Sequence, residues 1–158
     1  LYLVGEKSSE AMYRACLDAA AEYGVADYVH MTGNQPQSVC RQYARNALAT
    51  LLPGEWNRVN IFYEVMGEGC VVLTNNNHSV DEFIDRGNNC LVYDTEAEAA
   101  EQLIALLNDP QRAQRIRANA HRTAIEQFLT LEKRFGMEAQ LVMDTASGNN
   151  TAYYPEII

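Results

Sequence analysis

Short runs of apolar, often β-branched residues alternate along the chain with longer segments in which apolar residues recur every three to four positions. A short apolar run bounded by turn residues is typical of a strand that is covered on both faces. Five runs fit this description: Leu1–Val4, Tyr28–Thr32, Ala47–Leu52, Cys70–Thr74 and Cys90–Tyr93. Glycine or proline follows the first three of them, as expected where a strand gives way to a loop.

The longer segments in the first half of the chain have the 3.6-residue period of amphipathic helices. The first is 9–23, with Gly24 as its C-cap. Its predicted apolar stripe is Met12, Cys16, Ala19 and Tyr23. A helix to about residue 45 is predicted to begin at Pro36, because proline suits the first turn. Residues 60–68 are predicted to form the third helix of this half.

Two capping boxes mark helix starts in the second half of the chain, Ser79 with Glu82 and Thr95 with Glu98. The helix that begins after Thr95 has a regular apolar stripe, which indicates the face that it buries. That predicted stripe is Ala99, Leu103, Leu106 and Leu107.

A long helical region is predicted after these segments. Asp109 caps its start, Pro110 occupies its first turn, and it reaches about residue 142, with Gly136 as a candidate break. Residues 144–158 are small and polar before they turn aromatic. We therefore expect a C-terminal tail that is ordered only where it packs on another surface.

Strands that alternate with helices of this length predict an α/β fold. Its core would be a doubly wound, Rossmann-like parallel sheet with helices on both faces, followed by a helical C-terminal region. In such a sheet the C-terminal ends of the strands lie at one edge, where ligands bind. Four segments should converge there: 5–7, 32–34, 53–55 and 74–77. Their glycines and asparagines permit close approach of a ligand.

Composition and charge restrict the class of protein. A chain of 158 residues with 47% hydrophobic residues has the size and apolar content of one domain, placed here at 1–143. The 21 acidic and 12 basic residues give a net charge of -9, which argues against nucleic acid as a partner. The apolar stretches are too short to span a membrane and no export leader is present, so a cytoplasmic protein is expected.

Cysteine and histidine are scattered instead of clustered. Four cysteines lack the short spacing of zinc or redox motifs, so we expect buried, reduced thiols at Cys16, Cys40, Cys70 and Cys90. Three histidines lack the i,i+4 spacing of a metal-binding pair: His30, His78 and His121. The sequence therefore predicts no metal site.

Two glutamates near the end of the third strand raise the question of whether they serve one site. Glu55 and Glu64 are nine positions apart. On one continuous helix, at about 100° per residue, they would lie on opposite faces. Glu55, however, falls in the predicted loop after the strand, and Glu64 lies in the next helix. Both can then face the same crevice, although Glu64 also fits an ordinary glutamate near a helix start.

The helix that carries Glu64 is predicted to begin beside this crevice. Its first free N–H groups, at 59–61 (Val59, Asn60 and Ile61), suit a phosphate, and the Glu64 carboxylate can accept hydrogen bonds from a vicinal diol such as a ribose. Arg58 offers a guanidinium to the same phosphate or is a solvated loop residue. The combination predicts a site for a nucleoside diphosphate.

The order of these segments resembles a known family. "LYLVG", "VHMTG" and "ATLLP" are each followed by a helix, and then come "EVMGEGCVVLT" and "DEFIDRGNNCLVYDTEAEAAEQLIALLNDP". Over about residues 1–128 this series is similar to the C-terminal, donor-binding domain of family-4 (group 1) retaining glycosyltransferases of GT-B fold. The resemblance implies a nucleotide-sugar donor, bound without a metal, whose sugar is transferred with retention to a glycan, lipid or protein.

The resemblance also implies roles for the two glutamates. In that family two glutamates with seven residues between them face the donor, the first near the sugar and the second on the ribose. Glu64 matches the second. Trp56 stands at the position of the first, and Glu55 matches it only if the loop is one residue longer. Residues 57–59 replace the glycine-rich loop of the family.

Other strand-end loops carry further implied contacts, although each of these residues also fits an ordinary turn or a solvated side chain. Gly33 and Asn34 would meet the nucleotide base. Asn75 lies in the loop expected beside the donor, where His78 would contact a sugar hydroxyl. Lys7 would meet a phosphate.

The chain begins at what resembles the second strand of that domain. The usual first strand and helix, with an arginine and a lysine for the diphosphate, and the N-terminal acceptor domain are expected to be missing from it. It thus resembles a fragment of a larger enzyme, inactive without the N-terminal domain. Two alternatives stay open: a degenerate, non-catalytic binding module, favoured by the replaced glycine loop, and half of a nucleotide-sugar epimerase.

Overall fold

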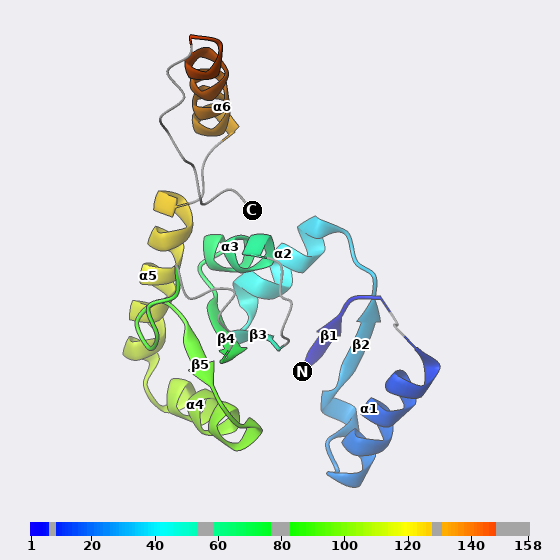
Figure 1. Cartoon of the computed structure of the whole chain (residues 1–158). Helices are drawn as coiled ribbons and strands as arrows, with labels where there is room; N and C mark the ends of the chain where they lie inside the picture. Colours follow the sequence, from blue (N-terminus) through cyan, green and yellow to red (C-terminus); the bar gives the residue numbers. More distant parts are fainter. Residues whose placement is uncertain (7–8, 54–58, 77–82, 128–130, 148–158) are drawn as a thin grey trace.

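The computed structural model describes residues 1–6, 9–53, 59–76, 83–127 and 131–147 (Figure 1). The elements are β1 (Tyr2–Val4), α1 (Glu10–Glu22), the 3-10 turn η1 (Ala26–Tyr28), β2 (His30–Gly33), α2 (Gln37–Asn46), β3 (Ala49–Leu52), α3 (Val59–Gly67), β4 (Val71–Asn75), β5 (Leu91–Tyr93), α4 (Glu96–Asn108), α5 (Pro110–Gln127) and α6 (Leu131–Ala146). Strands and helices alternate from β1 to β4, which confirms the predicted α/β class.

All strand pairs are parallel, as predicted, but they form two hydrogen-bonded ladders. β1 pairs with β2, and β3, β4 and β5 pair in that order, with β4 in the middle. Within the described residues no pairing joins β1 to β3, so each of these strands has one open edge. The strands thus form two sheets in place of the expected single one. Local sequence patterns indicate which residues form strands but not which strands pair, so this division could not be predicted from them.

Among the described strands, β4 is the most completely buried. Val71, Val72 and Leu73 expose none of their surface, and neither does Thr74. Successive side chains of a strand point to opposite faces, so these residues enter two separate hydrophobic clusters. The Thr74 hydroxyl donates to the carbonyl oxygen of Leu52 in β3 at 2.9 Å. A strand without a polar side requires helices on both faces of its sheet.

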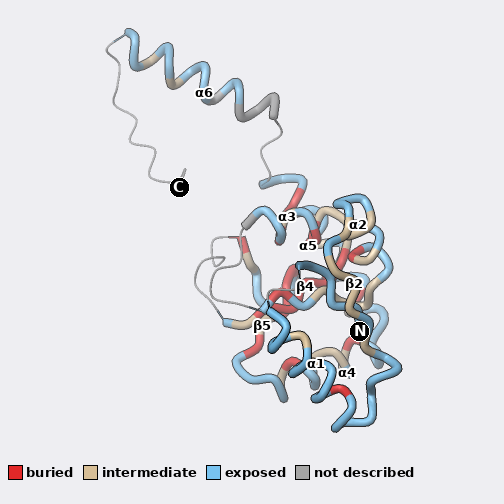
Figure 2. Tube along the Cα trace, turned by 90° about the vertical axis from the view of Figure 1, so that its right-hand side faces the viewer, coloured by how far each residue is buried: buried red, intermediate tan, exposed pale blue. Residues whose placement is uncertain are grey.

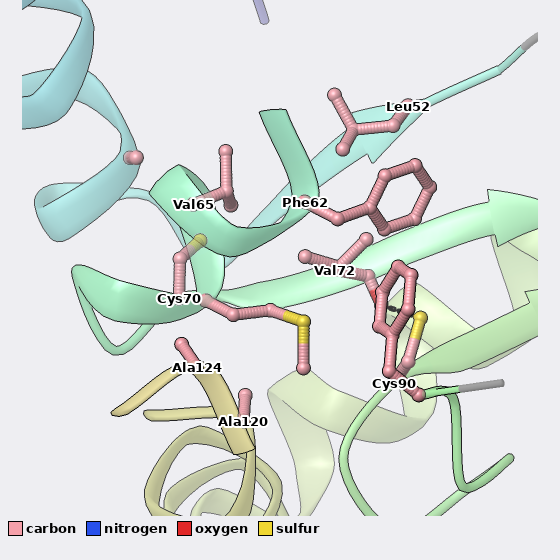
Figure 3. Close-up of a cluster of buried hydrophobic side chains, with 11 residues drawn as sticks. Leu52, Phe62, Val65, Cys70, Val72, Cys90, Ala120 and Ala124 are labelled. Atoms are coloured by element: carbon pink, nitrogen blue, oxygen red, sulfur yellow. Dashed lines mark hydrogen bonds between the residues drawn. The ribbon is translucent and has the colours of Figure 1, made fainter. Parts of the chain in front are cut away.

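The first cluster covers one face of the β3–β4–β5 sheet (Figure 3). It brings together Phe62 and Val65 of α3, Val72 of β4 and two alanines from the second half of α5. The ring of Phe62 meets Phe83 edge to face, with centroids 5.8 Å apart. The full set of buried members is Ala44, Leu52, Phe62, Val65, Met66, Cys70, Val72, Phe83, Cys90, Ala120 and Ala124.

The second cluster covers the opposite face and draws on α4 and on the first half of α5. Its buried members are Val71, Leu73, Leu91, Tyr93, Ala99, Leu106, Ala113 and Ile116. Helix α5 therefore contributes to both clusters. Arg117 donates from Nη2 to the carbonyl oxygens of Ala47 at 2.6 Å and Leu48 at 3.3 Å. These hydrogen bonds tie α5 to the start of β3.

The predicted helix starts are confirmed at three caps. Ser9 accepts the N–H of Met12 at 3.0 Å, Thr95 accepts the N–H of Glu98 at 3.2 Å, and Asp109 accepts that of Arg112 at 2.9 Å. The Glu98 carboxylate accepts from the backbone N–H of Asp94, one residue before the expected position. The capping box predicted at Ser79 and Glu82 lies outside the described residues.

The predicted buried faces of two helices are wrong in part. In α1 the half-buried or buried positions are Tyr13, Cys16 and Ala20, whereas Met12 and Ala19 are exposed. Because Ala20 is buried and Ala19 is exposed, the buried face of α1 is shifted by about one residue from the predicted stripe. In α4, Leu107 is 65% exposed, whereas the adjacent Leu106 is buried. Successive residues of a helix point about 100° apart, so Leu107 lies on a different side of α4 from Leu106.

Gly136 does not divide the C-terminal helical region. It lies inside α6, which runs from Leu131 to Ala146. One glycine costs a helix about 1 kcal/mol relative to alanine, a cost that the helix-forming residues around it outweigh. α6 also continues to Ala146, beyond the predicted helix end and into the segment predicted as a tail. The rest of that tail, 148–158, lies outside the described residues.

The β1–β2 unit buries little of its apolar surface. Leu3 and Val4 are 37% and 40% exposed, and Leu1 and Tyr2 more than half exposed. Buried positions gather instead around β4, β5 and α5, as Figure 2 shows. The ring of Tyr2 lies 5.1 Å from that of Tyr43 in α2, which links the two parts of the molecule.

Removal of the Phe62 ring should test the packing of α3 on the sheet. We expect Phe62→Ala to lower the free energy of unfolding by about 3–5 kcal/mol, because the ring is fully buried and its loss leaves a cavity. Phe135→Ala is the matched control, since Phe135 is 63% exposed on α6 and its loss should change stability by about 0.5 kcal/mol or less. Urea unfolding followed by circular dichroism measures both. Equal effects would contradict the assigned core.

The two ladders should also differ in local stability. We expect the amides of β4 to exchange with deuterium most slowly, because β4 is paired on both sides and buried on both faces. Amides of β1 should exchange by local opening, since a two-stranded ladder with exposed side chains is marginal alone. Hydrogen exchange read by mass spectrometry of peptic fragments measures this. Equal protection of β1 and β4 would contradict it.

Candidate functional site

The C-terminal ends of the strands meet in two pairs. Gly5, after β1, donates its N–H to the carbonyl oxygen of Gly33 at the end of β2, at 3.1 Å. Gly33 has a φ of 66°, which residues with side chains rarely adopt, and Asn34 beyond it is exposed. In the other pair, Thr74 binds Leu52, and the half-buried Asn75 ends β4.

Helix α3 starts after β3 on the same edge. It begins at Val59, and the next two residues, Asn60 and Ile61, are exposed, Ile61 by 41%. The first N–H groups of a helix have no acceptor within the helix, which makes this turn suitable for an anion. Four other predicted site residues lie outside the described residues: Lys7, Glu55, Arg58 and His78.

The predicted ribose ligand, Glu64, is exposed on the second turn of α3. Its Oε1 accepts a hydrogen bond of 2.9 Å from Nε2 of Gln37, the first residue of α2. Because α2 follows the Gly33–Asn34 loop, this bond joins the segment after β2 to the segment after β3. The sequence analysis did not find Gln37, whose partner is 27 positions away.

Further along α2, and directly after the end of α3, lies an ion-pair cluster. Glu68 accepts from Nε of Arg45 at 3.0 Å and also pairs with Nη2 of Arg45, and its other oxygen lies 3.8 Å from Nε of Arg41. We call the five residues that link α2 to α3 the α2–α3 ladder: Gln37, Arg41, Arg45, Glu64 and Glu68. The ladder holds the two helices in a fixed relation.

A second polar network holds the loop that leaves β4. Asn76 donates its backbone N–H to Tyr93 and its side-chain amide to Asp94, both at 2.9 Å, and accepts from Arg86 at 2.7 Å. The sequence analysis placed Asn76 in this loop but missed Arg86 and Asp94. The position of Asp94 directly after β5 is a sequence signal for this contact, because the end of β5 lies beside the end of β4.

Two hollows open elsewhere on the surface. One of about 320 Å³ lies between 83–89 and the second half of α5, and one of about 370 Å³ lies against β5, α4 and the start of α5. Neither is lined by Glu64 or Gln37. Among the described residues, no group of His, Cys, Asp and Glu is arranged to hold a metal ion, and no helix is long and apolar enough to cross a membrane.

The thiols differ in burial, contrary to the expectation of four buried cysteines. Cys70 and Cys90 are buried, whereas Cys16 and Cys40 are half-buried. Burial raises the pKa of Cys70, although a hydrogen bond with Thr50 opposes the shift. Burial raises the pKa of Cys90 to about 12. Both thiols therefore stay protonated at neutral pH and belong to the core, not to the edge.

Comparison with protein families gives one match, to the glycosyl transferase-like model, which covers residues 17–137. This is well over half of the chain. No curated protein matches the sequence.

Several solved structures have this fold. Anabaena Alr3699/HepE, solved in complex with UDP, is 17% identical with a TM-score of 0.77 over 90% of this chain and 40% of that one. Sucrose-phosphate synthase from Thermosynechococcus elongatus is 19% identical with a TM-score of 0.76, over 94% of this chain and 39% of that one. WaaG is 20% identical with a TM-score of 0.67, over 82% and 34%. The chain thus spans about 40% of the length of the first of these.

Thiol labelling tests the burial of the cysteines. At about pH 8, we expect Ellman's reagent to modify Cys16 and Cys40 of the folded protein but not Cys70 and Cys90, because only an accessible thiolate reacts. All four should react in urea. In the unfolded state Cys90 loses its proton above the ordinary thiol pKa of 9.0, whereas in the folded state it retains the proton up to about pH 12. The free energy of unfolding should therefore fall as the pH rises between these two values. Rapid labelling of all four in the folded state would contradict this assignment.

Proposed function

This chain belongs to the glycosyl transferase-like family, and we propose that it forms the donor-binding half of an enzyme that transfers a sugar from a nucleoside diphosphate. The proposed acceptor is a glycan, lipid or protein, and the proposed transfer retains the configuration at the sugar without a metal. The solved structure of Alr3699/HepE in complex with UDP-glucose, which has the same fold, supports a nucleotide-sugar donor.

The observation that carries the proposal is the position of Glu64. Its carboxylate is exposed at the strand-end edge, about one turn beyond the free N–H groups at the start of α3, and its partner there is a neutral amide. A ribose offers neighbouring hydroxyl donors to such a carboxylate, while the diphosphate suits the helix start. One nucleoside diphosphate can therefore satisfy both groups.

The remaining roles concern the diphosphate and the sugar. In the proposal, the α3 start at Val59, Asn60 and Ile61, together with Arg58 and Lys7, stabilises the charge that develops on the leaving diphosphate. Glu55 and His78 contact the sugar, and Gly33, Asn34 and Asn75 line the base and donor loops. The carboxylates position the donor and do not attack it.

We further propose that this half works within a longer enzyme. Residues 1–143 would be the donor domain and 144–158 a tail. The open edges of β1 and β3 support this proposal, because one additional parallel strand between them would unite the two ladders into a single sheet. An acceptor-binding domain would supply the other wall of the active site. Four cysteines without disulfides are consistent with the reducing cytoplasm as the proposed location.

Nucleotide binding with Glu64→Ala tests the proposed function. Uridine, guanosine and adenosine diphosphates are titrated by calorimetry, and thermal unfolding is followed in parallel. We expect one of them to bind the wild-type chain and to raise its stability by about 2.7 kcal/mol at a concentration of 100 times Kd. Glu64→Ala should weaken that nucleotide by about 10-fold or more, because a hydrogen bond to a charged group is lost.

Glu101→Ala is the matched control, since Glu101 is an exposed glutamate on α4, away from the edge. It should bind the nucleotide like the wild-type chain. Binding of no nucleotide to the wild-type chain would contradict the proposal and favour a non-catalytic module. Equal binding by wild type and Glu64→Ala would remove Glu64 from the site.

A further inference from the structure

The α2–α3 ladder is asymmetric in charge. From α2, Gln37, Arg41 and Arg45 project at intervals of four residues, the spacing of one helix face. Glu64 of α3 and Glu68, which directly follows the last residue of α3, are also four positions apart. Three α2 positions thus meet two carboxylates, and the distribution of cations between them decides what each carboxylate can bind.

Both arginines pair with Glu68. Their side chains are 50% and 65% exposed, but the Glu68 side chain is 14% exposed and is enclosed between them. Glu64, at the end of the ladder closest to the strand ends, meets the amide of Gln37 instead. Among the described residues no cation pairs with Glu64. Glu68 is thus held by both arginines, whereas the only described partner of the Glu64 side chain is an amide.

This difference has a chemical consequence. A guanidinium binds a carboxylate as a fork through two parallel hydrogen bonds and occupies both oxygens. A glutamine amide donates to one oxygen and leaves the other oriented but unoccupied by it. A charged acceptor that is fixed and not neutralised is what a sugar hydroxyl requires, since a hydroxyl must donate its proton to an oxygen.

Resting on the function proposed above, we propose that Gln37 is a positioning residue for the nucleotide: it holds Glu64 by Oε1 and directs Oε2 toward the ribose hydroxyls. Gln37 thereby links the loop after β2, proposed for the base, to the carboxylate proposed for the ribose. The pair also sets a preference for ribonucleotides, because the 2′-hydroxyl supplies one of the donors. Position 37 then requires a side chain that is neutral and donates a hydrogen bond to Glu64.

Two substitutions separate this role from a structural one. Gln37→Ala removes the support of Glu64, and we expect it to weaken binding of the nucleotide by about 3- to 10-fold, as for loss of one hydrogen bond. Gln37→Arg should form a fork with Glu64, weaken binding by about 10-fold or more, and leave the unfolding midpoint unchanged or raised. A purely structural role predicts equally stable helices for Gln37→Arg, but an unchanged affinity for the nucleotide.

The experiment is calorimetry of the whole chain with uridine, guanosine and adenosine diphosphates, each beside its 2′-deoxy counterpart. Wild type should prefer the ribonucleotide by about 10-fold, and both Gln37 variants should narrow that preference. Gln42→Ala, an exposed glutamine on the same helix, is the matched control and should bind like wild type. Urea unfolding of each variant accompanies the titrations.

The outcomes distinguish this inference from the proposed function. Nucleotide binding that depends on Glu64 but is unchanged in Gln37→Ala and Gln37→Arg would overturn the role of Gln37 and leave the function in place. Equal affinity of wild type for ribo- and deoxyribonucleotides would overturn the assigned preference. Absence of binding by all three nucleotides would overturn both.

Discussion

The burial of β4 on both faces is the constraint on which the rest of the structure depends. Four successive residues, 71–74, expose no surface, and three of them are apolar. Such a strand is stable only between two layers of helices, so α3 must lie on one face and α4 on the other, with α5 reaching both. The same arrangement brings the start of α3 to the C-terminal end of β3. The position of the site therefore follows from the packing of one strand.

Much of the fold can be predicted from the sequence because its signals are local. Apolar runs indicate the strands, and side-chain caps such as Thr95 and Asp109 indicate where helices begin. The pairing of strands is not local, and the separation of β1–β2 from β3–β4–β5 could not be predicted in this way. Nor could the exact face of α1, since a shift of one residue changes which alanine is buried.

The candidate site was predictable to the extent that single residues carry it. Glu64, Gly33, Asn34 and the first turn of α3 stand where strand ends and a helix start require them. Gln37, Arg86 and Asp94 were missed, because their partners are 10 to 27 positions away. In the α2–α3 ladder, both arginines pair with Glu68 because of the way α2 and α3 are placed beside one another. No local sequence pattern contains that placement.

The dual role of α5 has a consequence for how the chain folds during synthesis. Arg117 reaches Ala47 across 70 positions, and Ala120 and Ala124 close the cluster around Phe62. None of this burial is gained until a long loop has closed, and contacts so distant in sequence form slowly. As the chain leaves the ribosome, β3 and β4 emerge well before α5, with part of one face of the sheet uncovered. Docking of α5 is then the late step that protects the nascent sheet from aggregation.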